Sequence, residues 1–132
     1  MRTSDARARL VSTALQLTWE RGYQGVGVDE LCKKAGVKPG SFYYFFRSKS
    51  ELASAALEEI FQQTRMHILT LLEARDVPAL DRIEKAFVRM YQLQLGVQKK
   101  CGRTCGCMIG NLGAELGGEE HALLDQVRVI FS

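Results

Sequence analysis

Hydrophobic residues recur at three- and four-residue spacing along most of this chain, which is the period of one face of a helix. Leu10, Ala14 and Leu17 lie one turn apart in a first predicted helix. That helix covers residues 6–21 and ends at Gly22, a residue suited to closing a helix. No stretch alternates apolar and polar residues as a strand does. The pattern predicts an all-α protein without internal repeats.

Two short helices follow, joined by the tetrapeptide AGVK. The first covers VDELCKKA, and the second begins at Pro39, where proline fits the first helical position, and runs to Phe46. A helix-turn-helix needs a small residue where the helices cross, here Cys32, and a turn residue that tolerates positive φ, here Gly36. Leu31, Val37 and Phe42 supply the apolar contacts that lock such a pair. The spacing predicts a helix-turn-helix.

Ser48 and Glu51 form a capping box, in which each side chain is expected to bind the other residue's backbone N–H, so a long helix is predicted to start there. Its expected buried stripe consists of Leu52, Ala55, Ala56, Ile60, Met66, Leu69 and Leu72. Pro78 ends this pattern, and a further helix is predicted over about 79–95. That helix carries an apolar side of Leu80, Ile83, Phe87, Met90, Tyr91 and Leu95.

Two more helices are predicted near the end of the chain. MIGNLGAEL reads as a short helix ended by Gly117 and Gly118, and the last helix begins with the acidic pair at 119–120. The apolar stripe of the last helix has nothing after it to cover it: Leu123, Leu124, Val127, Ile130 and Phe131. The sequence is therefore expected to be the N-terminal part of a longer chain.

Charge is distributed unevenly over the 132 residues. The first 50 residues contain nine lysines and arginines against four acidic residues, a net of +5 within a total of +3. Clustered basic residues favour a polyanionic partner, although many solvated helical surfaces reach this density. The chain has neither a secretion signal nor an apolar run long enough to cross a bilayer, so we expect a cytoplasmic protein with no membrane contact.

In a helix-turn-helix the second helix lies in the major groove of double-stranded DNA. Lys38, Gly40, Ser41 and Tyr44 are then expected near base edges or the DNA backbone. Tyr43 offers a phenolic donor to phosphate, and Lys49 offers a positive charge. The predicted DNA-binding residues are Lys38, Pro39, Gly40, Ser41, Tyr43, Tyr44 and Lys49. The alternative is that the aromatic run of the second helix is only core, as in any helical bundle.

The stretch RLVSTALQLTWERGYQGVGVDELCKKAGVKPGSFYYFFRSKSEL resembles the N-terminal domain of TetR-type transcriptional regulators. The shared features are a first helix ending in Gly-Tyr, the helix-turn-helix, and a Gly-Ser-aromatic run that leads to Ser-Lys-x-x-Leu. The resemblance implies a homodimeric repressor that binds a palindromic operator. It also implies phosphate contacts from Tyr43 and Lys49.

The resemblance further implies two domains, a DNA-binding domain over 1–47 and, over 48–132, the N-terminal part of a helical ligand-binding and dimerisation domain. A small-molecule inducer would occupy a pocket in the second domain and move the helix that starts near Ser48. Four apolar residues there can line a cavity, but residues of this kind at helical spacing are more often plain core: Met66, Phe87, Met90 and Tyr91. No cofactor is expected.

Cys101, Cys105 and Cys107 lie within the heptapeptide CGRTCGC. A reducing compartment argues against a disulfide framework. Basic neighbours and, for Cys107, a position at the start of a helix favour the thiolate and therefore reaction with oxidants or electrophiles. GCMIGNLGAEL is also similar to a segment of a TetR subgroup that includes repressors of electrophile- and oxidant-detoxifying enzymes, and Cys107 matches its cysteine.

Two readings compete with the sensor. The thiols are inert, or they bind a soft metal with His121 or Cys32 as a distant fourth ligand, although Cys-x3-Cys-x-Cys is not a standard zinc spacing. We therefore predict no metal site, and keep as an alternative function a thiol- or metal-handling helical module without specific DNA binding. An enzyme is disfavoured, because the chain has only two histidines, and no nucleophile lies at motif spacing to either.

Overall fold

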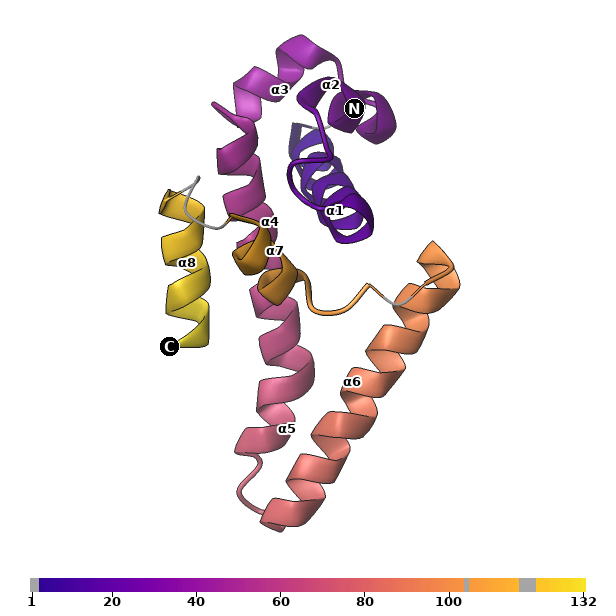
Figure 1. Cartoon of the computed structure of the whole chain (residues 1–132), viewed down its shortest axis with the longest axis vertical. Helices are drawn as coiled ribbons and strands as arrows, with labels where there is room; N and C mark the ends of the chain where they lie inside the picture. Colours follow the sequence, from indigo (N-terminus) through magenta and orange to yellow (C-terminus); the bar gives the residue numbers. More distant parts are fainter. Residues whose placement is uncertain (1–2, 104, 117–120) are drawn as a thin grey trace. The chain divides into compact units, whose positions relative to one another are not determined.

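A computed structural model describes residues 3–103, 105–116 and 121–132 of the chain. These residues form helices joined by turns, with no strand in the described ranges (Figure 1). The helices are α1 (Thr3–Arg21), α2 (Val28–Ala35), α3 (Pro39–Phe45), α4 (Lys49–Thr64), a π-helical turn (Arg65–Leu69), α5 (Thr70–Glu73), α6 (Ala79–Cys101), α7 (Met108–Leu116) and α8 (His121–Phe131). The predicted all-α fold is confirmed. The expected helix end at Gly117 and Gly118 and the acidic pair at 119–120 lie outside the described residues.

The core of the N-terminal part forms because α1, α2 and α3 each bury one apolar face. Leu10 of α1 and Phe42 of α3 are fully buried, and Leu31 of α2 is nearly so. Gly22 ends α1 with a positive φ of 81°, and its N–H donates to the carbonyl oxygen of Thr18 at 2.8 Å. The first three predicted helices are confirmed, except that α1 starts a few residues earlier, at Thr3, and α3 ends one residue earlier, at Phe45.

The start of α4 is capped by Ser48, but not by the reciprocal box that the sequence predicts. The Ser48 hydroxyl oxygen accepts a hydrogen bond from the Glu51 N–H at 3.2 Å. The Glu51 carboxylate accepts from the Arg47 N–H at 3.3 Å, one residue before the expected donor. The carboxylate therefore ties the end of the α3 segment to the first turn of α4.

The chain divides into two compact units, Met1–Glu59 with Cys107–Ser132, and Ile60–Gly106. The boundary between residues 47 and 48 stays a prediction. In the first unit α8 joins α4, because the Ser54 hydroxyl donates to the Gln126 amide oxygen at 2.7 Å and the Gln126 amide donates to the Ser54 carbonyl oxygen at 3.0 Å. Leu123 and Val127 are buried. The expectation that the stripe of the last helix is uncovered is wrong for these two residues.

The second unit contains a hairpin in which α6 packs against the π-helical turn and α5. A π-helical turn holds more residues than an α-helical turn, so it rotates the apolar stripe of the helix. Ile68 is buried, whereas Met66 is 68% exposed and Leu72 lies on the surface. The predicted stripe is therefore wrong at Met66 and Leu72.

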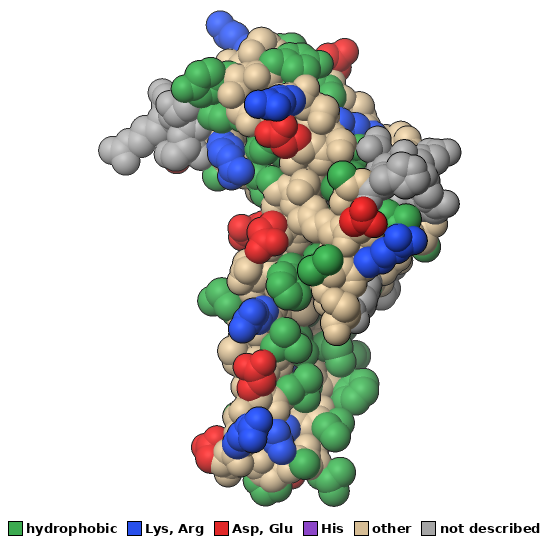
Figure 2. All heavy atoms as spheres, turned by 90° about the vertical axis from the view of Figure 1, so that its left-hand side faces the viewer, with side chains coloured by type: hydrophobic (Ala, Val, Ile, Leu, Met, Phe, Trp, Pro, Cys, Tyr) green, Lys and Arg blue, Asp and Glu red, His purple; other side chains and the backbone are tan. Residues whose placement is uncertain are grey.

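The apolar side of α6 lies largely on the surface. Phe87 and Tyr91 are about two-thirds exposed and Leu80 is 80% exposed, while Ala86 is buried. Within this unit α6 packs against the π-helical turn and α5, and hydrophobic side chains are visible over the hairpin at the bottom of Figure 2. The reading of Met66, Phe87, Met90 and Tyr91 as plain core is wrong for this structure. None of the helices described here is both long and apolar enough to cross a membrane.

Candidate functional site

The turn between α2 and α3 has the geometry of a helix-turn-helix. Gly36 adopts a left-handed conformation with φ 69° and ψ 35°, and the Val37 N–H donates to the Cys32 carbonyl oxygen at 2.9 Å. Cys32 is 1% exposed at this crossing, which a larger side chain would not fit. Burial raises the pKa of the Cys32 thiol, and the nearby Asp29 carboxylate raises it further. This cysteine is therefore a neutral packing residue.

Helix α3 divides its side chains between core and solvent. Phe42 and Phe46 are buried, with ring centroids 6.0 Å apart, and Arg7 of α1 lies 5.2 Å over the Phe46 ring. The opposite face is exposed, with Tyr43 62% and Tyr44 77% accessible. Six of the seven predicted DNA-binding residues are exposed together around this helix: Lys38, Pro39, Gly40, Ser41, Tyr43 and Tyr44.

Lys49, the seventh of these residues, is held by an aromatic ring at the start of α4. Its ammonium group lies 4.1 Å from the centroid of the Tyr23 ring, a cation–π distance. Tyr23 is itself only 4% exposed, so the ring is a fixed platform. The position of the Lys49 charge therefore depends on the position of Tyr23.

Tyr23 belongs to the loop after α1, and a carboxylate from α7 binds that loop. The two Glu115 oxygens accept hydrogen bonds from the backbone N–H groups of Tyr23 and Gln24, each at 2.7 Å. Gly22 allows this approach, because a Cβ atom on it would lie 2.8 Å from Glu115 Oε2. Glu115 is a candidate functional residue that the sequence pattern did not reveal. Its only signal was its place in the segment that contains Cys107.

The three clustered cysteines occupy different local settings. Cys101 is the last residue of α6, Cys105 follows in the connecting loop, and both are half-buried. Cys107 is exposed directly before α7, and its carbonyl oxygen accepts from the Asn111 N–H at 2.9 Å. All four cysteines carry free thiols. The helix-start position expected for Cys107 is confirmed.

The metal-site alternative requires three or more ligands that lie close together. In the part of the chain that the structure describes, no group of three or more histidine, cysteine, aspartate or glutamate residues has such an arrangement. Cys32, the proposed distant ligand, is buried between α2 and α3. The side chain of His121, the other candidate, lies outside the described residues.

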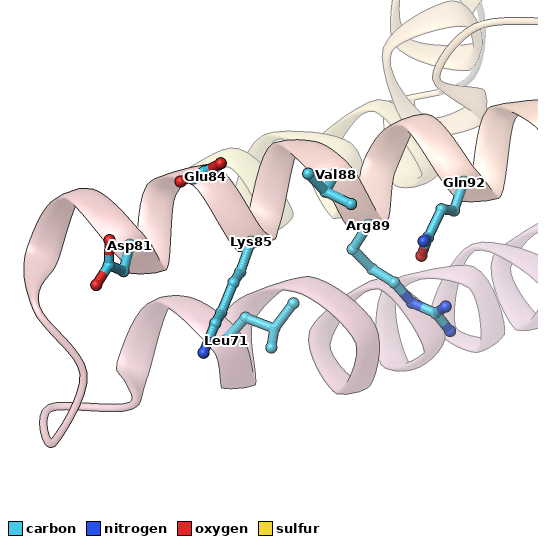
Figure 3. A pocket seen from close by; sticks show the side chains of 7 residues that line it. All are labelled: Leu71, Asp81, Glu84, Lys85, Val88, Arg89 and Gln92. Carbon is cyan, nitrogen blue, oxygen red and sulfur yellow. The ribbon is translucent and has the colours of Figure 1, made fainter.

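The hairpin of the second unit has an open groove of about 460 Å³. Leu71 of α5 and Val88 of α6 are apolar parts of its lining, and Lys85 extends from α6 toward α5 beside Leu71 (Figure 3). Arg89 is fixed by His67, with its guanidinium nitrogen 3.1 Å from Nδ1 of the ring. The groove is therefore lined by charged as well as apolar side chains, whereas the sequence left an apolar cavity and plain core as alternatives.

Comparison with known proteins agrees with the helix-turn-helix geometry of the N-terminal part. Residues 10–56 match the model of the bacterial regulatory proteins of the tetR family. The chain is 36% identical over 112 residues to the HTH-type transcriptional repressor NemR of Escherichia coli and 33% identical over 131 residues to the HTH-type transcriptional repressor DhaR of a Mycobacterium strain. These alignments cover 85% and 99% of this chain, but 54% and 62% of the relatives.

Solved structures extend the similarity over nearly the whole chain. SCO4454, a TetR-family transcriptional regulator from Streptomyces coelicolor, matches with a TM-score of 0.79 and 26% identity, over 96% of this chain and 64% of that one. Escherichia coli NemR in its reduced form matches with a TM-score of 0.73 and 32% identity, over 96% of this chain and 65% of that one. Together with the helix-turn-helix geometry, these matches show that the chain belongs to the tetR family of bacterial regulatory proteins.

Proposed function

We propose that this protein is a transcriptional repressor that binds a palindromic DNA operator as a homodimer and is released by a small-molecule, electrophilic or oxidising inducer. The observation that carries the DNA-binding part is the exposed face of α3. That helix uses Phe42 for packing, while Lys38, Ser41 and Tyr44 remain on the surface. Relatives that are named as transcriptional repressors support the same role.

The chemistry of the α3 face suits a duplex. Tyr43 presents a phenolic donor and Lys38 a charge, which are groups that bind phosphate oxygens and fix the register of a protein on DNA. Ser41 and Tyr44 are exposed beside them as candidates for base-edge or backbone contacts. Two copies of this helix in successive major grooves, about 34 Å apart, would fit half-sites one helical turn apart.

The DNA-binding proposal is tested by titrating the protein against the DNA upstream of its own gene in gel shifts. We expect a complex that survives an excess of unrelated duplex, and a protected sequence with two-fold symmetry. Sedimentation of the complex should give two protein chains per site. A protein that binds both duplexes equally contradicts the proposal and favours the alternative of a thiol-handling module.

For release we propose that Cys107 is the reacting group. Its side chain is exposed, whereas Cys101 and Cys105 are half-buried and Cys32 is buried. With an electrophile such as N-ethylmaleimide, the Cys107 sulfur forms a C–S bond to one alkene carbon, the alkene π bond breaks, and the other carbon takes up a proton. Accessibility controls such reactions as much as thiolate character does.

The test of this step is the variant Cys107→Ser, with Cys105→Ser and Cys101→Ser as matched controls. We expect Cys107→Ser to bind DNA like the wild type and to stay bound after N-ethylmaleimide treatment, while both control variants are released. Mass spectrometry of the treated proteins identifies which thiols carry the adduct. Release of Cys107→Ser at the wild-type dose would rule out this cysteine.

A further inference from the structure

Glu115 joins two parts of the sequence that lie more than 90 residues apart. Its Oε2 accepts from the Tyr23 N–H and its Oε1 accepts from the Gln24 N–H, both at 2.7 Å. Hydrogen bonds of this length to a carboxylate are charge-assisted. One side chain of α7, that of Glu115, therefore fixes two consecutive backbone N–H groups in the loop between α1 and α2.

These two N–H groups follow directly after the end of α1. Helix α1 ends at Arg21, and the Gly22 N–H donates to the Thr18 carbonyl oxygen at 2.8 Å. Gly22 then turns the chain with φ 81°, and the next two N–H groups point at the Glu115 carboxylate. The conformation after α1 and the position of α7 therefore depend on each other.

The same loop leads to the charge at the start of α4. Tyr23 is buried, and its ring supports the Lys49 ammonium at 4.1 Å. Lys49 is one of the groups proposed above to contact DNA phosphate. A shift of the Tyr23 backbone would move the ring and with it the Lys49 charge.

In the other direction Glu115 is rigidly connected to Cys107. Helix α7 begins at the residue after Cys107, and Glu115 lies eight positions after Cys107, about 12 Å along the helix axis at 1.5 Å per residue. Ile109 and Leu112 are buried, so the nine-residue helix is anchored by its apolar face. A displacement of the first turn of α7 is therefore passed to Glu115 by the helix as a unit.

We propose that Glu115 is a positioning residue that holds the loop at residues 22–24 in its DNA-binding conformation. Modification of Cys107 then weakens DNA binding because it moves the Glu115 carboxylate away from this loop. This inference deepens the proposed function and rests on it for its DNA readout. The carboxylate touches neither DNA nor inducer. It acts through Tyr23 and, from there, through Lys49.

The first experiment follows hydrogen exchange at the amides of Tyr23 and Gln24, which needs no DNA. We expect these amides to exchange at least about tenfold faster in Glu115→Gln than in the wild type, because the amide side chain offers one acceptor in place of two. Alkylation of wild-type Cys107 with N-ethylmaleimide should produce the same increase. The control is Glu84→Gln, an exposed glutamate of α6, which should exchange like the wild type.

The second experiment compares DNA affinity with and without alkylation of Cys107. In the wild type and in Glu84→Gln we expect alkylation to weaken binding by about tenfold or more, within the usual range of allosteric coupling. Glu115→Gln should start with weaker binding and change by less than about twofold on alkylation, although mass spectrometry shows a complete adduct. Glu115→Asp, which keeps the charge but is one methylene shorter, separates reach from charge, and we expect it to behave like Glu115→Gln.

The outcomes distinguish the two proposals. If the wild type fails to bind specific DNA, the proposed function is wrong, whereas the exchange experiment still decides the role of Glu115. If exchange at Tyr23 and Gln24 is the same before and after alkylation, the inference is overturned. A Glu115→Gln protein that loses DNA affinity on alkylation by the same factor as the wild type overturns it as well.

Discussion

Gly40 is the most informative position on the α3 face, because the described residues give neither a packing nor a backbone reason for a glycine there. It is the second residue of α3, and a Cβ atom added to it meets no atom of the described residues within 4 Å. Its φ is not positive, in contrast to Gly22 and Gly36. Glycine within a helix costs about 0.5–1 kcal/mol relative to alanine. We therefore expect that the absence of a side chain serves the approach of DNA.

The substitution Gly40→Ala should change stability and DNA binding in opposite directions. Because the position is in the first turn, the gain in the free energy of unfolding should be about 0.5 kcal/mol, at the lower end of the helix scale. For a chain of this size that corresponds to a rise in Tm of about 1–3 °C. A methyl group between the α3 backbone and the duplex should weaken DNA binding by about tenfold, or about 1.4 kcal/mol.

Thermal unfolding followed by circular dichroism measures the first effect, and fluorescence anisotropy with a labelled operator measures the second. Gly96→Ala is the matched control, because Gly96 lies inside α6 and an added Cβ there also meets no atom within 4 Å in the part of the chain that the structure describes. This control should gain about 1 kcal/mol in stability and bind DNA like the wild type. Wild-type affinity in Gly40→Ala would refute the close approach of DNA at this residue, and a loss of stability would refute the argument about its backbone.

Two further predictions concern charge. Lys49→Gln should weaken DNA binding similarly for all sequences and reduce the slope of log affinity against log salt concentration by about 0.9 per lost phosphate contact. Tyr43→Phe should weaken binding without changing that slope, because the phenol carries no charge. Equal slopes for both variants and the wild type would contradict the role of Lys49. For Cys32, a folded-state pKa above the ordinary value of 9.0 means that the folded state holds its proton more tightly. The protonated thiol therefore contributes to stability in full below pH 9, and this contribution is lost as the pH rises through the folded-state pKa. In denaturant unfolding between pH 8 and 11, the free energy of unfolding should decline more steeply for the wild type than for Cys32→Ala.

The helix-turn-helix was predictable because its determinants lie close together in the sequence. Cys32, Gly36 and Phe42 fall within eleven residues, and each has a local requirement that its residue type reveals: small size, positive φ and apolar packing. The exposed face of α3 followed from the same periodicity. The capping of α4 was predicted at Ser48 and missed at Glu51, because Arg47 and Ser48 offer neighbouring N–H groups to one flexible carboxylate.

Glu115 was not predictable as a ligand of the α1–α2 loop. Its partners are backbone N–H groups, which carry no residue-type signal, and they lie over 90 positions away. The predicted buried stripe of the helix that starts near Ser48 is wrong for a related reason, since the α-helical period does not predict a π-helical turn at Arg65–Leu69. Likewise, the apolar residues of α6 reveal a face but not what covers it, so the sequence suggested a core where the hairpin leaves Phe87 exposed.

The strength of the contact between Glu115 and the α1–α2 loop suits a contact that must break when the protein releases DNA. Its carboxylate is on the surface and the Gln24 N–H is exposed, so water competes for at least one of the two hydrogen bonds. Bonds to a charged group contribute roughly 1.5–3 kcal/mol when shielded and less when exposed to solvent. A regulatory coupling of 5- to 150-fold needs only about 1–3 kcal/mol. The free energy of the two hydrogen bonds is therefore comparable to the coupling free energy that modification of one thiol must supply. A fully buried ion pair in this place would hold the loop in one state.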